Sequence, residues 1–153
     1  MVWKPRVTVA VVAEQDGRYL LVEENIAGRY CFNQPAGHLE DGESLVDAAV
    51  RECLEETAWQ IRPEAIVGIY RWRSARQQDT FLRVTFAARC IAHLPESPLD
   101  PDIVAVHWSS LDEIHARRSQ LRSPLVMQSF TDYLQGRRYP LDLLVDIDGD
   151  PDA

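Results

Sequence analysis

The run from Ser44 to Thr57 restricts the fold of this chain more than any other segment. It is rich in Ala, Leu, Arg and Glu and is the clearest helix in the sequence. Its apolar side chains fall on one side of such a helix, which is expected to pack against a core; they are Val46, Ala49, Val50 and Cys53.

Three glutamates lie on a different side of the same predicted helix. At ~100° per residue, Glu52, Glu55 and Glu56 share an arc of roughly 100°. Carboxylates this close repel one another, and a hard divalent cation such as Mg²⁺ would turn the repulsion into a binding site. The alternative is a solvated acidic face, partly balanced by an Arg51–Glu55 pair one helical turn apart.

A glycine-containing loop before the helix favours the metal site over the solvated face. Asn33-Gln34-Pro35-Ala36-Gly37 cannot be helical, and Gly42 and Glu43 follow before the helix begins. Glycines let a loop approach closely and turn its backbone groups inward. A backbone carbonyl near Gly37 is therefore a candidate metal ligand beside the glutamates.

This pattern of Gly37, five residues, Glu43, seven residues and Arg51-Glu52-x-x-Glu55-Glu56 resembles the Nudix box of the Nudix hydrolases. Enzymes of that family cleave a nucleoside diphosphate linked to another group. Two positions depart from the usual box: it normally ends in Gly and an aliphatic residue, where this chain has Ala58-Trp59, and Cys53 replaces an aliphatic residue. Because of the first departure, the resemblance does not predict the conformation of the turn after the helix.

The resemblance implies a site and a fold. It makes Glu52, Glu55 and Glu56 the metal-binding carboxylates, with Glu55 or Glu52 also acting as the base for water. It implies that Glu43 pairs with Arg51 to hold the loop on the helix. The implied cofactor is Mg²⁺, with Mn²⁺ as a substitute, and the implied fold is the Nudix α/β/α sandwich around a central mixed sheet.

The order of elements predicted from the residues agrees with an α+β fold. Strands are predicted at 7–13, 19–22, 66–72, 81–89 and 103–108, and capping signals predict helices after Ser110 and after Ser123. We expect one domain over residues 1–145 and an acidic, frayed tail over residues 146–153.

Composition limits the partners. The chain of 153 residues carries a formal net charge of −8, which disfavours binding to nucleic-acid polymers. The sequence has no apolar run long enough for a membrane helix, and its three widely spaced cysteines favour a reducing cytoplasm. We expect a small nucleotide or pyrimidine pyrophosphate as the ligand, bound by a monomer or a homodimer.

Several side chains outside the box are candidates for substrate binding. Arg71, Arg73 and Arg83 lie on predicted strands and could grip phosphate, although exposed strand arginines are common. Tyr30 and Phe32 precede the glycine loop and could stack on a ring or pack in the core. His38 could donate to phosphate or brace the loop. For an additional carboxylate near the metal, Asp102 is favoured over Glu96 and Asp100 because it is nearest the next strand.

A closer resemblance, to one phosphatase branch of the family, covers nearly the whole chain. It is carried by Lys4 to Ala10, Asn33 to Glu40, Phe81 to Arg83, Leu121 to Val126 and Arg138 to Leu141. It implies release of terminal phosphate from nucleoside tri- and diphosphates and from hydroxymethylpyrimidine pyrophosphate. Two alternatives remain: a pyrophosphatase for dinucleoside polyphosphates, ADP-ribose or nucleotide sugars, and a non-catalytic domain that senses a nucleotide.

Overall fold

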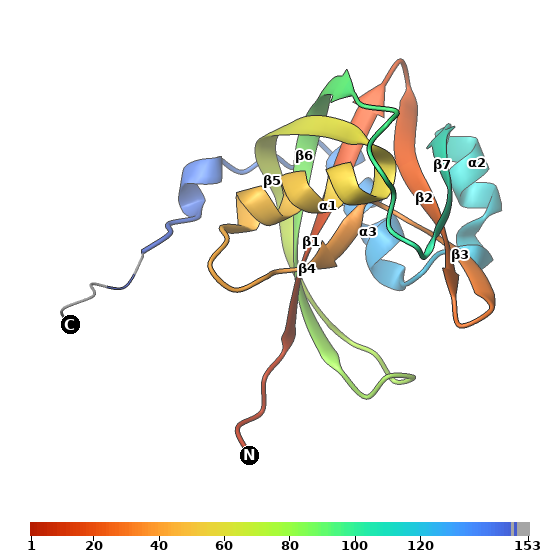
Figure 1. Ribbon diagram of the computed structural model, residues 1–153. Helices are drawn as coiled ribbons and strands as arrows, with labels where there is room; N and C mark the ends of the chain where they lie inside the picture. The colour runs from red at the N-terminus through yellow and green to blue at the C-terminus, as the bar shows by residue number, and fades with distance from the viewer. Residues whose placement is uncertain (148, 150–153) are drawn as a thin grey trace.

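The computed structural model describes residues 1–147 and 149 and consists of a seven-stranded sheet with helices on both faces (Figure 1). The strands are β1 (Arg6–Gln15), β2 (Arg18–Ile26), β3 (Arg29–Asn33), β4 (Ala36–His38), β5 (Trp59–Arg73), β6 (Thr80–His93) and β7 (Ile103–Ser109). The helices are α1 (Leu45–Thr57), α2 (Leu111–Ala116) and α3 (Pro124–Leu134), with 3₁₀ turns η1 (Arg118–Gln120) and η2 (Leu141–Leu143).

The sheet is mixed, as the resemblance to the Nudix family implied. β1 and β6 pair in parallel, whereas the β5–β6, β1–β2, β1–β4, β2–β3 and β2–β7 pairs are antiparallel. One edge of β1 is shared, because β4 pairs with residues 8–10 and β2 pairs with residues 14 and 15. This sharing places the glycine loop that contains β4 against the middle of the sheet.

The apolar run in β1 is continuous because both of its faces are covered. Val9 and Val11 pack with Ala49 and Cys53 of α1 on one face. Val12 packs on the other face, in a cluster that includes residues of α2 and α3. Figure 1 shows α1 in front of the sheet and α3 behind it. The predicted α/β/α sandwich is thereby confirmed.

Helix α1 begins and ends at specific caps. The Ser44 hydroxyl accepts a hydrogen bond from the Asp47 backbone N–H at 3.0 Å. At the other end Ala58 takes the left-handed conformation, with φ of 60°, and its N–H donates to the Leu54 carbonyl. The turn that a box glycine normally makes is therefore preserved with alanine, at the cost of backbone strain.

The strands β5 and β6 are longer than predicted. β5 starts at Trp59 rather than near Ile66, and β6 continues to His93 rather than ending near Arg89. Register shifts between Gln60 and Ile61 and further along β5 interrupt the two-residue alternation on which a sequence prediction depends. Beyond the sandwich the two strands continue as a projecting hairpin arm, closed by residues 74–79 (Figure 1).

The later helices begin where the sequence predicted. Ser110 and Glu113 form a reciprocal capping box at α2, and Ser123 caps α3 ahead of Pro124. The expected fraying of the tail concerns residues 146–153, of which 148 and 150–153 lie outside the described residues.

Candidate active site

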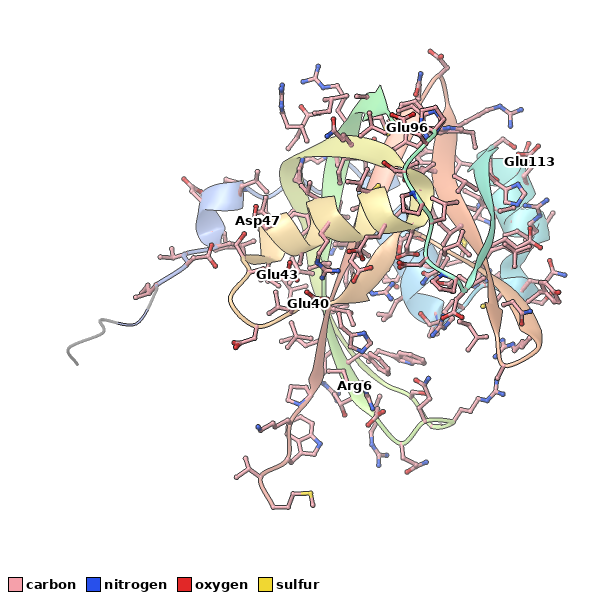
Figure 2. The ribbon with its side chains drawn as sticks, in the orientation of Figure 1. Arg6, Glu40, Glu43, Asp47, Glu96 and Glu113 are labelled. Carbon is pink, nitrogen blue, oxygen red and sulfur yellow. The ribbon has the colours of Figure 1, made fainter. Side chains whose placement is uncertain are left out.

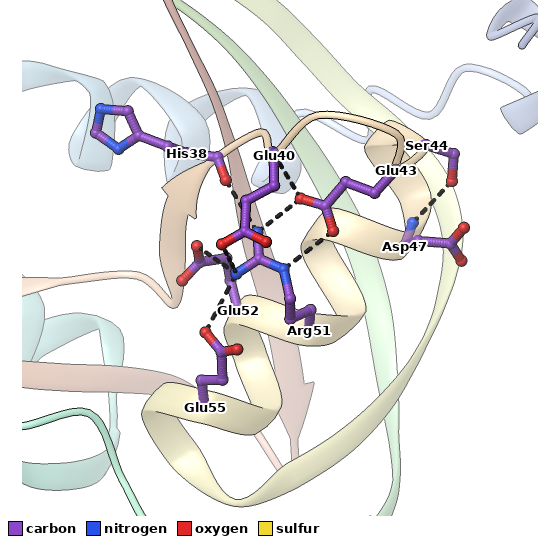
Figure 3. A network of polar contacts seen from close by, with 8 residues as sticks. All are labelled: His38, Glu40, Glu43, Ser44, Asp47, Arg51, Glu52 and Glu55. Atoms are coloured by element: carbon purple, nitrogen blue, oxygen red, sulfur yellow. Dashed lines mark hydrogen bonds and ion pairs between the residues drawn. The ribbon is translucent and has the colours of Figure 1, made fainter.

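Arg51 of α1 is the centre of a polar network that ties the glycine loop to the helix (Figure 3). Its Nε and Nη2 atoms donate to the two carboxylate oxygens of Glu43 at 3.0 and 2.7 Å, which is the pairing expected from the box. Nη2 also donates to the His38 carbonyl at 3.0 Å. The hydrogen bonds from Arg51, together with its positive charge, hold the pKa of Glu43 below its usual value, although burial of the carboxylate acts in the opposite direction.

The same guanidinium orients two of the box glutamates. Nη1 of Arg51 donates to Oε1 of Glu52 at 3.0 Å and to Oε2 of Glu55 at 3.1 Å. One arginine therefore fixes the loop through Glu43 and two acidic side chains through its remaining N–H groups. Its charge partly neutralises the acidic face, which makes that face compatible with a folded helix in the absence of a cation.

The backbone of Gly37 lies very close to the side chain of Glu52. A Cβ atom at this position would overlap the carboxylate of Glu52, so no other residue fits without a shift. The Glu52 side chain is only 12% exposed, and burial together with Glu55 and Asp100 raises its pKa. The loop thus presents its backbone directly to a crowded carboxylate.

Glu56 is the most buried of the box glutamates. Its Oε1 accepts a hydrogen bond from the Ala36 N–H at 2.9 Å, whereas its Oε2 is buried without a hydrogen-bond partner among the described residues. Burial, with Glu24, Glu52 and Asp100 nearby, raises the pKa of Glu56 well above its usual value. A buried oxygen without a partner beside other carboxylates is the environment that a bound cation relieves.

A fourth acidic residue joins this group from the loop before β7. Carboxylate oxygens of Glu52, Glu55 and Asp100 all lie within 4.8 Å of one another. The sequence argument favoured Asp102 for this position, and in the structure Asp100 takes it. Figure 2 places Glu96 near the C-terminal end of α1, whereas Glu40 and Glu43 lie at the N-terminal end.

Asp100 joins the glutamates because of the path of its loop, and its distance from the strand does not decide this. Its backbone N–H donates to the Glu55 carbonyl at 2.9 Å, which docks the loop on the end of α1. Asp102 lines the same cavity, but its carbonyl accepts from the Asn25 N–H and so belongs to the β2–β7 contact. Asp102 was favoured because it is near β7. In the structure this same position makes its backbone part of the sheet contact.

Glu52, Glu56, Asp100 and Asp102 line one side of a cavity of about 1220 Å³, whereas Glu55 is not among its lining residues. Its walls come from the glycine loop, α1, β2, β3, the β5–β6 arm, the loop before β7, and the segment from α2 into α3. Arginines line it as well, namely Arg29, Arg73, Arg76, Arg83, Arg118 and Arg122. A ligand in this space therefore meets carboxylates and guanidinium groups together, which suits a metal-bound phosphate.

Arg83 is the most unusual of these arginines. It is 6% exposed, and its Nε and Nη1 atoms are buried without a hydrogen-bond partner among the described residues. Burial, reinforced by Arg122, lowers its pKa to about 10. Arg122 by contrast is paired with Glu24, with 2.7 Å between Nη1 and Oε2. Arg83 is therefore a buried cation whose donors are available to an anion.

The other side chains that were predicted to bind substrate differ in whether they line the cavity. His38 and Arg73 line the cavity, but Arg71 does not. Phe32 is 8% exposed and packs with Leu121 and Val126 in the core, which is the second of the two roles considered for it. Tyr30 is 58% exposed and is not among the residues that line the cavity.

Two aromatic residues that line the cavity were missed. Trp72 and Phe81 stack on each other, with 5.5 Å between ring centroids and 25° between ring planes. Their alternation with Arg71 and Arg83 along the two strands is visible in the sequence. Only the register that puts Trp72 opposite Phe81 shows that the two rings form a pair.

The donor set fits a divalent cation: clustered carboxylate oxygens, an oxygen of Glu56 without a partner, and a glycine backbone pressed against Glu52. The NUDIX domain family matches residues 3–130, which is most of the chain. The chain belongs to the Nudix hydrolase family. Nudix hydrolases use divalent metal ions, and the carboxylates of Glu52, Glu55 and Asp100 form an acidic cluster of the kind that can hold one.

Other members of the Nudix family are similar to this chain in sequence and in structure. Phosphatase NudJ of Shigella boydii serotype 4 (strain Sb227) is 44% identical over 144 residues, covering 94% of this chain and 93% of the relative. Phosphatase NudJ of Escherichia coli (strain K12) has the same identity and coverage. A NUDIX hydrolase from Nitrosomonas europaea superimposes with a TM-score of 0.94 at 51% identity, covering 96% of this chain and all of that one.

This Nudix hydrolase is accordingly an enzyme that hydrolyses small diphosphate-containing substrates. Within residues 1–147 and 149, no helix is both long and apolar enough to cross a membrane.

Proposed function

We propose that the protein is a Mg²⁺-dependent phosphatase that releases orthophosphate from nucleoside tri- and diphosphates and from hydroxymethylpyrimidine pyrophosphate. The observation that carries the proposal is one cavity lined both by Glu52, Glu56 and Asp100 and by Arg83, whose Nε and Nη1 atoms have no hydrogen-bond partner among the described residues. The similarity to phosphatases named NudJ supports this reaction over other Nudix activities.

The metal would be held by Glu52, Glu55 and Glu56, with the Gly37 carbonyl and Asp100 completing the set. Mg²⁺ prefers carboxylate and carbonyl oxygens and retains sites for water and substrate phosphate; Mn²⁺ can use the same ligands. When bound, the cation supplies positive charge that holds phosphate oxygens and offsets the charge that develops on the leaving group.

The protein's own side chains have separate tasks in this proposal. Glu55 is the base that orients a water and accepts its proton, because its side chain is 42% exposed and its position is fixed by Arg51. Glu52 is the alternative base, but it is more buried and lies against Gly37. Arg83 holds a phosphate through its two free donors, and His38 and Arg73 lie at the cavity wall to assist.

A product-resolved assay tests the proposal. The purified protein is incubated with a nucleoside triphosphate, a nucleoside diphosphate and hydroxymethylpyrimidine pyrophosphate, with Mg²⁺ and with EDTA. We expect orthophosphate only when Mg²⁺ is present. Two nucleotide fragments, or a nucleotide and a sugar phosphate, would instead identify a pyrophosphatase for dinucleoside polyphosphates, ADP-ribose or nucleotide sugars. Binding without any turnover would identify a nucleotide-sensing domain.

Arg83→Gln tests the residue assignment within this proposal. The substitution keeps a polar side chain with N–H donors but shortens it and removes the charge, so we expect KM to rise by about 10-fold or more through loss of a charge-assisted contact. Arg89→Gln is the matched control, since Arg89 lies on the same strand but is exposed and pairs with Glu64. Equal effects of the two substitutions would exclude a specific role for Arg83.

A further inference from the structure

The stacked pair Trp72 and Phe81 has no assigned role, yet it lines the cavity, one residue pair away from the loop that closes the hairpin arm. The two residues lie directly opposite each other in the β5–β6 register, and both side chains are partly exposed. They present flat apolar surface inside a cavity that otherwise carries many charged groups. Such a surface suits a flat ring better than it suits a phosphate.

Strand geometry sets the distance between this pair and Arg83. Phe81 and Arg83 are two residues apart on β6, so their side chains leave the same face of the sheet at a spacing of ~7 Å. Arg83 lies level with Thr8 of β1, which in turn pairs with His38 of β4. The stack is therefore about two strand steps beyond the level at which the box loop and Arg83 meet the cavity.

We infer that Trp72 and Phe81 form the subsite for the aromatic ring of the substrate, either a nucleobase or a free pyrimidine. This inference rests on the proposed function, because it assigns the ring of a molecule whose phosphates lie at Arg83 and the acidic group. A spacing of ~7 Å suits a ring joined to its phosphates directly or through one sugar. Stacking accepts any base, so the enzyme distinguishes ring-bearing from ring-free diphosphates more strongly than one base from another.

The pair could instead serve only to stiffen the hairpin arm, since cross-strand aromatic pairs stabilise hairpins. The arm already has another restraint at this level, because Nε of Arg6 in β1 donates to Oδ2 of Asp79 at 2.7 Å. Figure 2 shows the position of Arg6. The stiffening role predicts that every substrate is affected equally when the pair is broken. The ring-binding role predicts that only substrates with a ring are affected.

The experiment compares uridine diphosphate and adenosine diphosphate with methyl diphosphate, which has no ring, in the wild type, Trp72→Leu and Phe81→Leu. We expect kcat/KM for both nucleotides to fall by ~10-fold or more, mainly through KM, and by less than ~2-fold for methyl diphosphate. Trp72→Tyr, which retains a ring, should recover most of the loss. Ile69→Ala is the matched control, because Ile69 is exposed on β5 and does not line the cavity.

Equal losses for all three substrates, or a loss restored only by conditions that raise the melting temperature, would overturn the inference in favour of stiffening. Unchanged kinetics in both leucine variants would also overturn it. If the wild type hydrolyses none of the diphosphates, the proposed function fails, and tryptophan fluorescence then decides the inference separately. In that case uridine monophosphate, but not ribose 5-phosphate, should quench the wild type and leave Trp72→Tyr less affected; equal quenching by both would refute ring binding.

Discussion

The backbone N–H of Asp100 donates a hydrogen bond to the carbonyl oxygen of Glu55, with 2.9 Å between nitrogen and oxygen. Glu55 lies in the last turn of α1, where carbonyl groups lack partners within the helix. The loop before β7 thus supplies a missing partner to the helix and, by the same contact, brings its own carboxylate to Glu52 and Glu55. A backbone bond that completes the helix end also completes the acidic group.

Asp100→Asn is expected to weaken metal binding without undocking the loop. The hydrogen bond to Glu55 comes from the backbone and survives the substitution, so only the negative charge is lost. We expect the Mg²⁺ concentration for half-maximal activity to rise by ~10-fold or more. Asp102→Asn and Glu96→Gln are the controls and should have smaller effects. A larger effect of Asp102→Asn would restore Asp102 as the additional carboxylate.

Glu56→Gln is expected to separate metal binding from folding. An amide removes the buried charge but is a poor Mg²⁺ ligand, so turnover should fall by at least ~100-fold. Without metal the melting temperature should stay the same or rise, because burial already disfavours the carboxylate. Mg²⁺ should raise the melting temperature of the wild type but not of the variant. A variant stabilised by Mg²⁺ as strongly as the wild type would exclude Glu56 as a ligand.

The Glu43–Arg51 pair should give stability that depends on pH. Hydrogen bonds from Arg51 lower the pKa of Glu43 in the folded state, so the contribution is present above the unfolded pKa of ~4.3 and is lost as the pH falls through the folded value. Glu43→Gln should therefore cost ~1–3 kcal/mol at pH 7 and less at about pH 3. Urea unfolding at both pH values measures this difference. A cost that grows on acidification would contradict the pairing.

The control for this pair is Arg51→Lys, which keeps a positive charge but loses the fork that holds Glu43 by two bonds. Its stability should lie between that of the wild type and that of Arg51→Ala.

Ala58→Gly should stabilise the protein. Ala58 has φ of 60°, a conformation that costs a residue with a Cβ roughly 1–2 kcal/mol and costs glycine little. We expect a gain of about 1 kcal/mol, which for a chain of this size raises the melting temperature by roughly 2–4 °C. Ala48→Gly, inside α1, should have the opposite sign. A decrease in melting temperature for Ala58→Gly would show that its methyl group has packing value that exceeds the strain.

Local sequence was sufficient for the box helix and its partners. The apolar and acidic faces of α1 follow from 3.6 residues per turn, and Ser44, Ser110 and Ser123 mark helix starts by hydrogen bonds that span only two or three residues. The Glu43–Arg51 pair was implied by the resemblance to the Nudix box, and it joins residues only eight apart in the chain. Features of this kind depend on residues that are close together in the chain, so they can be predicted from the sequence.

Tertiary structure decided the features that depend on register and loop path. Asp100 rather than Asp102 joins the glutamates because the loop docks on the end of α1. Phe32 enters the core while Tyr30 stays exposed, and Trp72 meets Phe81 only because β5 and β6 pair in one register. Sequence alone determined the chemistry available to this protein, because residue type and helical spacing are local. The residues that share the cavity were decided by long-range pairing, since contacts between distant segments depend on how the whole sheet is assembled.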